Sequence, residues 1–287
     1  MKTIAPPHPD PRKPAFALPD GACDAHCHVF GPAARFPYAA GRRYTPPDAP
    51  AEKLAALHRH LGVSRAVLVQ ASAHGTDNRA MLDAIARDPA RLRGVAMVEA
   101  TISDAELAAL HAGGVRAVRY NFVRHLGGAP DDATIRQMAR RIAPLGWHLV
   151  LHLDAENLLE HRDFLHRLPV PFVIDHMGRV NADDGLLQSP FRRLVELLRD
   201  GLAWVKVSGA ERVSRALGDF HDALPFAEEL VATAPDRVLW GTDWPHPNVR
   251  EMPDDGALVD LIPRFAPDEA LRRKLLVDNP SHLYWRE

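Results

Sequence analysis

At 287 residues, with 46 % hydrophobic and 25 % charged side chains, the chain can bury one large core, and its length suits a single α/β barrel. Its formal net charge of −2 excludes a strong electrostatic attraction to nucleic acid or to a membrane surface, so we expect neither as a partner. There is no run of eighteen apolar residues to predict a transmembrane helix, and the N-terminal segment lacks the apolar centre of a signal peptide. We therefore expect a cytoplasmic monomer or homo-oligomer.

The predicted elements follow a proline-rich segment, residues 1–20, that we expect to form an extended arm on a barrel domain of residues 21–287. In that domain short apolar runs, which are typical of buried strands, alternate with segments of helical period. The predicted strands are Ala22–Val29, Ala66–Ala71, Gly94–Val98, Ala117–Phe122, His148–Leu153, Phe172–His176, Ala203–Val207 and Val238–Thr242. The predicted helices are Ala51–Leu61, Asn78–Arg87, Asp104–Ala112, Asp131–Ala143, Asn157–Leu168, Pro190–Arg199 and Phe220–Ala234. Leu271–Tyr284 is expected to give a last helix, a turn at Asn279-Pro280 and a short tail.

This alternation predicts a parallel sheet, because parallel strands need helical crossovers. Eight such units close into a single-domain (β/α)8 TIM barrel. An open, doubly wound sheet is the alternative, but the sequence has neither a Gly-x-Gly-x-x-Gly fingerprint after the first strand nor a P-loop. A long loop over residues 30–50 follows the first strand and is expected to cover the site.

The first predicted strand carries the run DAHCH, which ends at His28. Because strand side chains alternate between faces, His26 and His28 are expected on one face and Cys27 on the other. Two imidazoles at the end of a strand can hold a divalent metal ion or orient a reacting water. Cys23 is expected on the same face as Cys27, and both are predicted to be buried free thiols, because an extended strand suits a disulfide poorly.

Further polar side chains follow the later strands, at the end of the barrel where active sites lie. The candidate metal ligands, for which zinc is the most suitable ion, are His26, His28, His152 and Asp243. His152 has the alternative role of a hydrogen-bonding group that faces substrate. Asp243 is also the candidate general base, since a carboxylate beside the nucleophilic water can take its proton.

Arginines form a second group near the predicted strand ends. Guanidinium groups bind carboxylates through two parallel hydrogen bonds, so several arginines at one mouth favour a substrate with more than one anionic group. These arginines are Arg119, Arg124, Arg179 and Arg212. Structural ion pairing is the alternative role for each of them. Tyr44, Ser72 and His74 could add hydrogen bonds from the covering loops.

Ordered sequence blocks cover nearly the whole chain from Gly21 to its end: GACDAHCHVFGP, FPY, RRYTPPDA, QASAHGTDNRAM, GVRAVRYNFV, IAPLGWH, DHMGR, VLWGTDWPHPN, MPDDG and KLLVDNP. In these blocks the chain resembles the amidohydrolase superfamily and, within it, the 2-pyrone-4,6-dicarboxylate hydrolases. The resemblance implies a (β/α)8 barrel that opens a small anionic lactone by attack of water. It implies that Asp243 activates the water, while three histidines orient it and polarise the lactone carbonyl: His26, His28 and His176. The residues implied to bind the substrate's carboxylates are Tyr44, Ser72, His74, Arg119, Arg179, Arg212 and Asn248.

Two positions depart from the pyrone hydrolase pattern, in which a tyrosine stands at the place of His152 and an arginine at the place of His125. Arg124, beside His125, could substitute for that arginine. Metal-dependent relatives in the superfamily place a histidine at the fifth strand, so the chain combines a pyrone-hydrolase framework with a metal-type ligand set. In this mixture it is also similar to sulfomuconolactone hydrolases. The resemblance leaves the cofactor open between none and one divalent metal ion, most suitably zinc.

Three functions remain open from the sequence. The first is hydrolysis of a small anionic lactone in aromatic-compound breakdown, either a 2-pyrone-4,6-dicarboxylate-like compound or, with zinc, another lactone such as a sulfomuconolactone. The second is a metal-dependent decarboxylase, because superfamily relatives use a similar set of three histidines and an aspartate. The third is a barrel that binds an anionic metabolite without turnover, which Asp243 disfavours because binding alone needs no general base.

Overall fold

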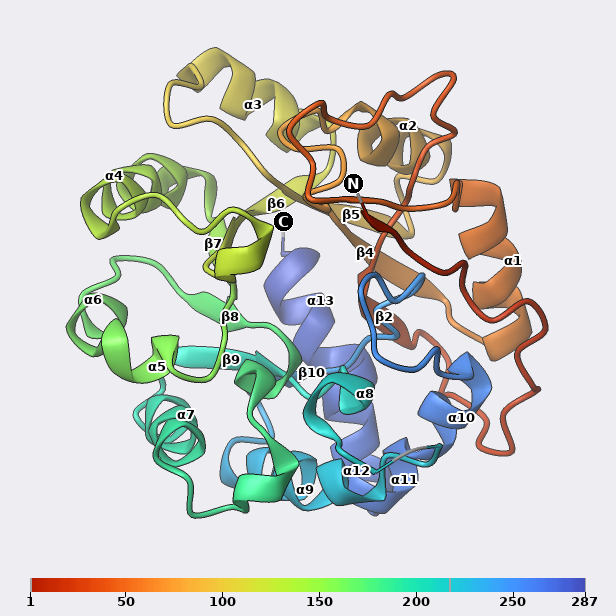
Figure 1. Cartoon of the computed structure of the whole chain (residues 1–287). Helices are drawn as coiled ribbons and strands as arrows, with labels where there is room; N and C mark the ends of the chain where they lie inside the picture. The colour runs from red at the N-terminus through yellow and green to blue at the C-terminus, as the bar shows by residue number, and fades with distance from the viewer. Residues whose placement is uncertain (1, 217, 287) are drawn as a thin grey trace.

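The computed structural model describes residues 2–216 and 218–286. Eight parallel strands lie in the order β10-β9-β8-β7-β6-β5-β4-β2, and helices surround them (Figure 1). Backbone hydrogen bonds join the two outermost strands of this order: Ala25 N–H donates to Trp240 O at 2.8 Å, and Asp243 N–H donates to His26 O at 2.7 Å. The sheet is therefore closed, and the predicted single-domain (β/α)8 barrel is confirmed over the open sheet.

All eight predicted strands are present. They are β2 (Cys23–Cys27), β4 (Arg65–Val69), β5 (Leu92–Ala96), β6 (Val115–Asn121), β7 (His148–His152), β8 (Phe172–Ile174), β9 (Ala203–Lys206) and β10 (Val238–Leu239). Helices cover the outer face of the barrel strands and side chains fill the interior, so both faces are buried and the strands stand out as continuous apolar runs. A separate two-stranded sheet pairs β1 (Lys2–Thr3) with β3 (Tyr44–Thr45), and β3 lies inside the predicted covering loop.

The helices on the outside of the barrel are α1 (Ala51–Leu61), α2 (Arg79–Arg87), α3 (Asp104–Ala112), α4 (Asp132–Ile142), α5 (Asn157–Glu160), α6 (Arg162–His166), α7 (Ser189–Arg199) and α9 (Leu224–Thr233). The short helix α8 (Ala210–Val213) lies at the mouth of the barrel. A capping box of Ser103 and Glu106 begins α3, and Asp131 caps α4 by accepting from Thr134 N–H. The helix predicted over Asn157–Leu168 is divided in two, because the backbone leaves helical geometry at His161.

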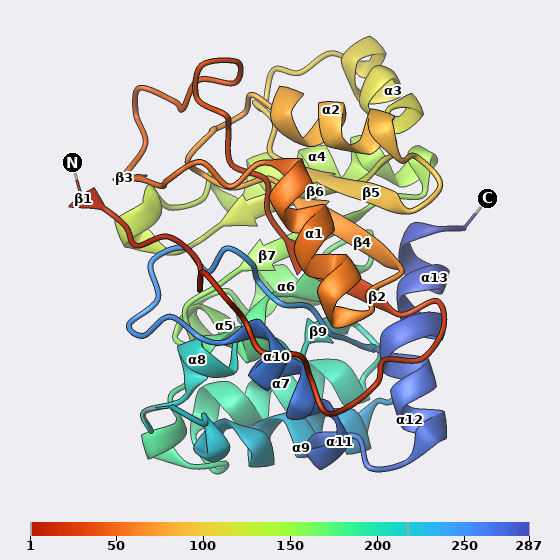
Figure 2. The ribbon, with the colours of Figure 1, turned by 90° about the vertical axis from the view of Figure 1, so that its right-hand side faces the viewer.

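The C-terminal part of the chain adds α10 (Asp255–Asp260), α11 (Ile262–Phe265), α12 (Glu269–Arg273) and α13 (Asn279–Tyr284), the last two joined by a π-helical segment, Lys274–Asp278. The prediction of a turn at Asn279-Pro280 is wrong, since these residues begin α13. Proline is tolerated there because the first turn of a helix needs no backbone N–H from it. Asn279 anchors the start of α13 by donating to Pro235 O and Val238 O, each at 2.8 Å. Figure 2 shows α13 at one end of the barrel and β1 and β3 at the other.

The first barrel strand departs from strict alternation. Its pairing with β4 shifts register between Asp24 and Cys27, as in a β-bulge. Cys23 consequently lies in the cluster inside the barrel, whereas Cys27 packs between the barrel and its helices. The prediction that the two cysteines share a face is therefore wrong, because an extra residue reverses the alternation. Both are buried free thiols, as predicted.

Within the described ranges, helices are too short or too polar to cross a bilayer. Within residues 2–20, β1 pairs with β3 of the covering loop, and the Arg12 guanidinium pairs with Asp260 of α10 at 2.7 Å. That residues 1–20 form an arm distinct from the barrel domain stays a prediction.

Candidate active site

A polar cavity opens at the carboxyl ends of the barrel strands, where the predicted site residues gather. The predicted residues that line it are His28, Tyr44, Ser72, Arg119, His152, His176, Arg179, Arg212, Asp243 and Asn248. His26 lies behind Asp243 rather than in the wall of the cavity. Residues from the covering loop, from six strand ends and from α8 thus meet around one space, as the topology of the barrel predicts.

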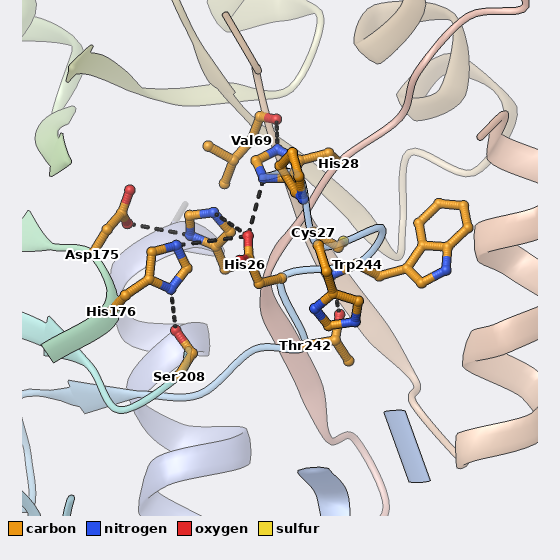
Figure 3. A network of polar contacts seen from close by, with 12 residues as sticks. His26, Cys27, His28, Val69, Asp175, His176, Ser208, Thr242 and Trp244 are labelled. Atoms are coloured by element: carbon orange, nitrogen blue, oxygen red, sulfur yellow. Dashed lines mark hydrogen bonds and ion pairs between the residues drawn. The ribbon is translucent and has the colours of Figure 1, made fainter. Parts of the chain in front are cut away.

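Asp243 stands at the centre of this site and is 1 % exposed. Its Oδ2 receives the Arg212 guanidinium, with Nε at 2.6 Å and NH2 at 2.5 Å. Its Oδ1 faces the Nε2 atoms of His28 at 3.2 Å, His26 at 3.5 Å and His176 at 3.6 Å, and Figure 3 shows these rings converging. Burial alone would raise the pKa of Asp243, but Arg212 and the imidazoles outweigh it and hold that pKa well below its usual range. The carboxyl group of Asp243 is therefore ionised, with Oδ2 held by Arg212 and Oδ1 directed at the imidazoles.

The loops that carry these side chains have unusual backbone conformations. Asp243 has φ 67°, and the turn after β8 is left-handed from His176 (φ 50°) to Arg179 (φ 51°). Left-handed conformations cost non-glycine residues about 1–2 kcal/mol each, so the surrounding contacts must hold them. Gly209 makes room for this turn, since a Cβ there would lie 2.8 Å from His176 Nδ1. This left-handed turn directs the side chains of His176 and Arg179 into the cavity.

His26, His28 and Asp243 fit the donor set of a divalent metal ion. His28 Nδ1 donates to Val69 O at 2.7 Å, and its Nε2 faces Asp243 Oδ1 at 3.2 Å. When Nδ1 alone carries a proton, Nε2 and Oδ1 face each other as two lone pairs, which need a proton or a cation between them. His26 Nε2 is also buried and lacks a hydrogen-bond partner among the described residues. The ligand atoms of these three residues lie within 4.8 Å of one another, and nitrogen and carboxylate donors of this kind suit zinc.

His152, the predicted fourth ligand, lies outside this group. Its Nε2 accepts from Arg179 NH1 at 3.3 Å, so that nitrogen is already engaged. Burial, with Arg119 and Arg179, holds the pKa of His152 well below its ordinary value, and the ring is neutral. This placement matches the alternative role, a neutral hydrogen-bonding group that faces substrate.

Among the described residues, three guanidinium groups line the cavity, those of Arg119, Arg179 and Arg212, against the single lining carboxylate of Asp243. Arg119 pairs from behind with Asp175 Oδ2 at 3.2 Å, and Arg179 Nε pairs with Asp154 Oδ1 at 3.1 Å. These pairs fix the direction of each guanidinium. The lining therefore favours an anionic ligand.

Two predicted substrate-binding residues lie elsewhere. His74 holds the covering loop, because its Nε2 accepts from Gly31 N–H at 3.1 Å and its Nδ1 donates to Pro37 O at 3.3 Å. Arg124 has a side chain that is 83 % exposed and pairs with Glu160 Oε1 at 3.3 Å. Its neighbour His125 lines the cavity instead.

We expect Arg124→Ala to leave KM unchanged and His125→Ala to raise it roughly fivefold, as loss of one hydrogen bond of about 1 kcal/mol would. Steady-state kinetics on the two variants measure the difference. A larger effect in Arg124→Ala than in His125→Ala would return Arg124 to the site.

Sequence reasoning missed the charged group beneath the site. Lys206, on β9, is completely buried, with Nζ 2.9 Å from His26 Nδ1 and 3.1 Å from Asp175 Oδ1. Asp175 also faces His26 Nδ1 at 3.2 Å. A signal was present in the sequence, because lysine is almost never buried unless it is paired, and Lys206 interrupts the apolar run AWVKV.

A family model described as amidohydrolase matches residues 23–286 of the chain. The chain belongs to the amidohydrolase family. Among its relatives, a 2-pyrone-4,6-dicarboxylate hydrolase of Comamonas testosteroni is 50 % identical over 288 residues, which cover 97 % of this chain and 94 % of that protein. A 4-sulfomuconolactone hydrolase of Rhizobium radiobacter is 43 % identical over 274 residues, 94 % of this chain and 92 % of the relative.

A solved structure extends this similarity to three dimensions. It is that of a probable 2-pyrone-4,6-dicarboxylic acid hydrolase of Acinetobacter baumannii, with citric acid bound. It is 27 % identical, with a TM-score of 0.81, and the match covers 93 % of this amidohydrolase and 100 % of that chain. The superfamily resemblance expected from the sequence blocks is confirmed.

Proposed function

We propose that this amidohydrolase hydrolyses a small anionic lactone, with 2-pyrone-4,6-dicarboxylate as the representative substrate. The observation that carries the proposal is Asp243, an ionised carboxylate with one oxygen bound by Arg212 and the other directed at three imidazoles beside an arginine-lined cavity. The named activity of the relative with 50 % identity supports the same chemistry.

Asp243 acts as general base in this proposal. Its Oδ1 takes a proton from a water held among the imidazoles while the water oxygen bonds to the lactone carbonyl carbon. The resulting tetrahedral intermediate collapses by breaking the bond from that carbon to the ring oxygen, which receives the proton. The products are the opened hydroxyl or enol group and a carboxylic acid, which releases its proton to solvent and becomes a carboxylate. Because Arg212 keeps Oδ2 occupied, the proton is directed to Oδ1.

The imidazole of His176 faces the carbonyl oxygen in this scheme. It stabilises the negative charge that develops there, an effect worth several kcal/mol in a buried site. His26, His28 and Asp243 have the donor types for a divalent metal ion, most suitably zinc, which would supply a Lewis acid and a more acidic water if His26 offered it a lone pair. The carboxylates of the substrate are bound by Arg119 and Arg179, with hydrogen bonds from Tyr44, Ser72, His152 and Asn248.

A second substrate, 4-sulfomuconolactone, is favoured by the relative with 43 % identity. His152 gives a specific reason to test it, because a neutral imidazole bound to Arg179 stands where the pyrone hydrolase pattern has a tyrosine. A sulfonate spreads its charge over three oxygens, so it accepts hydrogen bonds from several donors at once.

Turnover of 2-pyrone-4,6-dicarboxylate, followed by loss of its ultraviolet absorbance, tests the proposal, with 4-sulfomuconolactone as the parallel substrate and zinc present or absent. Opening of either lactone supports hydrolysis and identifies the better substrate by kcat/KM. Release of carbon dioxide would instead identify a decarboxylase. Binding of both compounds without turnover would leave a binding protein and overturn the proposal.

We expect Arg179→Met to lower kcat/KM by about 2–4 kcal/mol, or roughly 30- to 1000-fold, because a partly buried guanidinium gives charge-assisted bonds to a carboxylate. Most of the loss should fall in KM if Arg179 binds the substrate equally before and during reaction. Steady-state kinetics measure this split. Arg124→Met, which removes an exposed guanidinium, is the matched control, and equal losses in both variants would exclude Arg179 from binding.

A further inference from the structure

Lys206 is a buried charged group beside the site to which the proposed mechanism gives no role. Its side chain is 0 % exposed, and its Nζ forms a triangle with His26 Nδ1 at 2.9 Å and Asp175 Oδ1 at 3.1 Å. The third side of the triangle joins His26 Nδ1 to Asp175 Oδ1 at 3.2 Å. Lysine and aspartate therefore compete for one imidazole nitrogen.

The two contacts require opposite states of His26. An ammonium group has only donors, so a hydrogen bond from Lys206 requires Nδ1 of His26 to accept. A carboxylate has only acceptors, so a hydrogen bond to Asp175 requires Nδ1 to carry the proton. In a neutral ring the proton resides on one nitrogen. The neighbour that holds Nδ1 thus decides whether Nε2 is an N–H donor or a lone pair.

The geometry favours Lys206 in this competition. Lys206 is closer to His26 Nδ1 than Asp175 is, by 2.9 Å against 3.2 Å. Asp175 also has other partners, with Lys206 at Oδ1 and two Arg119 nitrogens at Oδ2, so it does not depend on His26. Lys206 has only His26 and Asp175 as partners among the contacts of the described residues.

We propose that Lys206 holds the His26 proton on Nε2 and makes His26 a hydrogen-bond donor that is withheld from a metal ion. The Nε2–H of His26 then points toward Asp243 Oδ1, 3.5 Å away. At this distance Nε2 makes no hydrogen bond to Oδ1, so it can donate to water or to the carbonyl oxygen of the substrate. The set of His26, His28 and Asp243 has the right donor types for zinc, but its first member is in the wrong tautomer while Lys206 is present. Lys206 is a positioning residue of the proposed function, since it acts through His26.

Nitrogen-15 NMR of the metal-free protein with labelled histidine tests this directly. We expect the His26 ring, assigned by its absence in His26→Gln, to show a protonated Nε2 and an unprotonated Nδ1. In Lys206→Met the proton should move to Nδ1, where Asp175 accepts it. A protonated Nδ1 in the unmodified protein would overturn the proposal, and that measurement needs no variant that must fold.

Zinc titration against a competing chelating dye gives a second readout that is independent of turnover. We expect Lys206→Met to bind zinc at least tenfold more tightly than the unmodified protein, and we expect the gain to disappear in Lys206→Met with His26→Gln. Lys274→Met, which removes a partly exposed lysine paired with Asp236 outside the site, is the matched control and should change nothing. A gain that persists without His26 would show a general charge effect and overturn the role of the tautomer. Neither experiment uses a lactone, so its failure is distinguishable from failure of the proposed function.

Discussion

Replacing Asp243 with asparagine should lower kcat by about 1000-fold, within the 10²–10⁴-fold range of general base catalysis, while leaving substrate binding nearly unchanged. Asparagine has the same shape, and its amide oxygen can still accept from Arg212, but it cannot take a proton from water. Steady-state kinetics measure kcat, and calorimetric titration of the inactive variant with the lactone measures binding.

The control for this variant is Glu160→Gln, another carboxylate-to-amide change, at an exposed residue that pairs with Arg124 outside the cavity. It should leave kcat and binding unchanged. A melting temperature for Asp243→Asn separates loss of chemistry from loss of fold, because the substitution leaves the buried Arg212 without its carboxylate. Near-full activity in a folded Asp243→Asn would exclude Asp243 as the base.

The architecture could be predicted from the sequence because its determinants are local. A barrel strand buried on both faces is a short apolar run, and each such run, from Cys23–Cys27 to Val238–Leu239, was visible between amphipathic segments. The position of the site followed from the same pattern, since the carboxyl ends of parallel strands meet at one edge. The sequence therefore predicts that His28, His176 and Asp243 lie close together, and the structure places them around one cavity.

Side-chain direction and long-range contacts could not be predicted in this way. His152 stands at the end of a strand, but only the folded chain places Arg179 on its Nε2. Arg124 and His125 are adjacent in a 3₁₀ turn, and the conformation of that turn decides which of them faces the cavity. Cys23 and Cys27 lie on opposite faces of the strand because of a β-bulge, which a prediction from strict alternation does not include.

The contacts of Lys206 are a further case in which long-range partners could not be predicted. A lysine inside an apolar strand has no local partner, and its burial is tolerable only because Asp175 and His26 come from other strands. Such a triangle depends on three separate segments, so no periodicity or spacing predicts it.

Replacing Arg212 with methionine should destabilise the folded protein by about 3–5 kcal/mol, since breaking a buried ion pair leaves an uncompensated charge, and it should also lower kcat/KM. The Arg212 guanidinium makes two contacts to Asp243 Oδ2, at 2.6 and 2.5 Å, and its side chain is 8 % exposed. Without it, burial is the dominant influence on Asp243, and burial raises the pKa of a carboxyl group. The base would then be protonated over part of the working pH range.

The pH dependence of the Arg212 variant has a definite sign. In the unmodified protein the pKa of Asp243 is depressed, so the base form and its contribution to stability persist above the unfolded value of about 3.9 and are lost only as pH falls through the lower folded pKa. In Arg212→Met the acidic limb of kcat/KM should move to higher pH. Acidification from neutrality should also stabilise the variant, because protonation removes its unpaired buried charge.

Arg215→Met is the matched control, because Arg215 is an exposed arginine three residues further along the chain that donates to Asn181. It should keep both the pH profile and the melting temperature of the unmodified protein. If Arg212→Met lost activity with an unshifted acidic limb, Arg212 would serve substrate binding alone. The ionisation of Asp243 would then have to be maintained by the imidazoles that face its Oδ1.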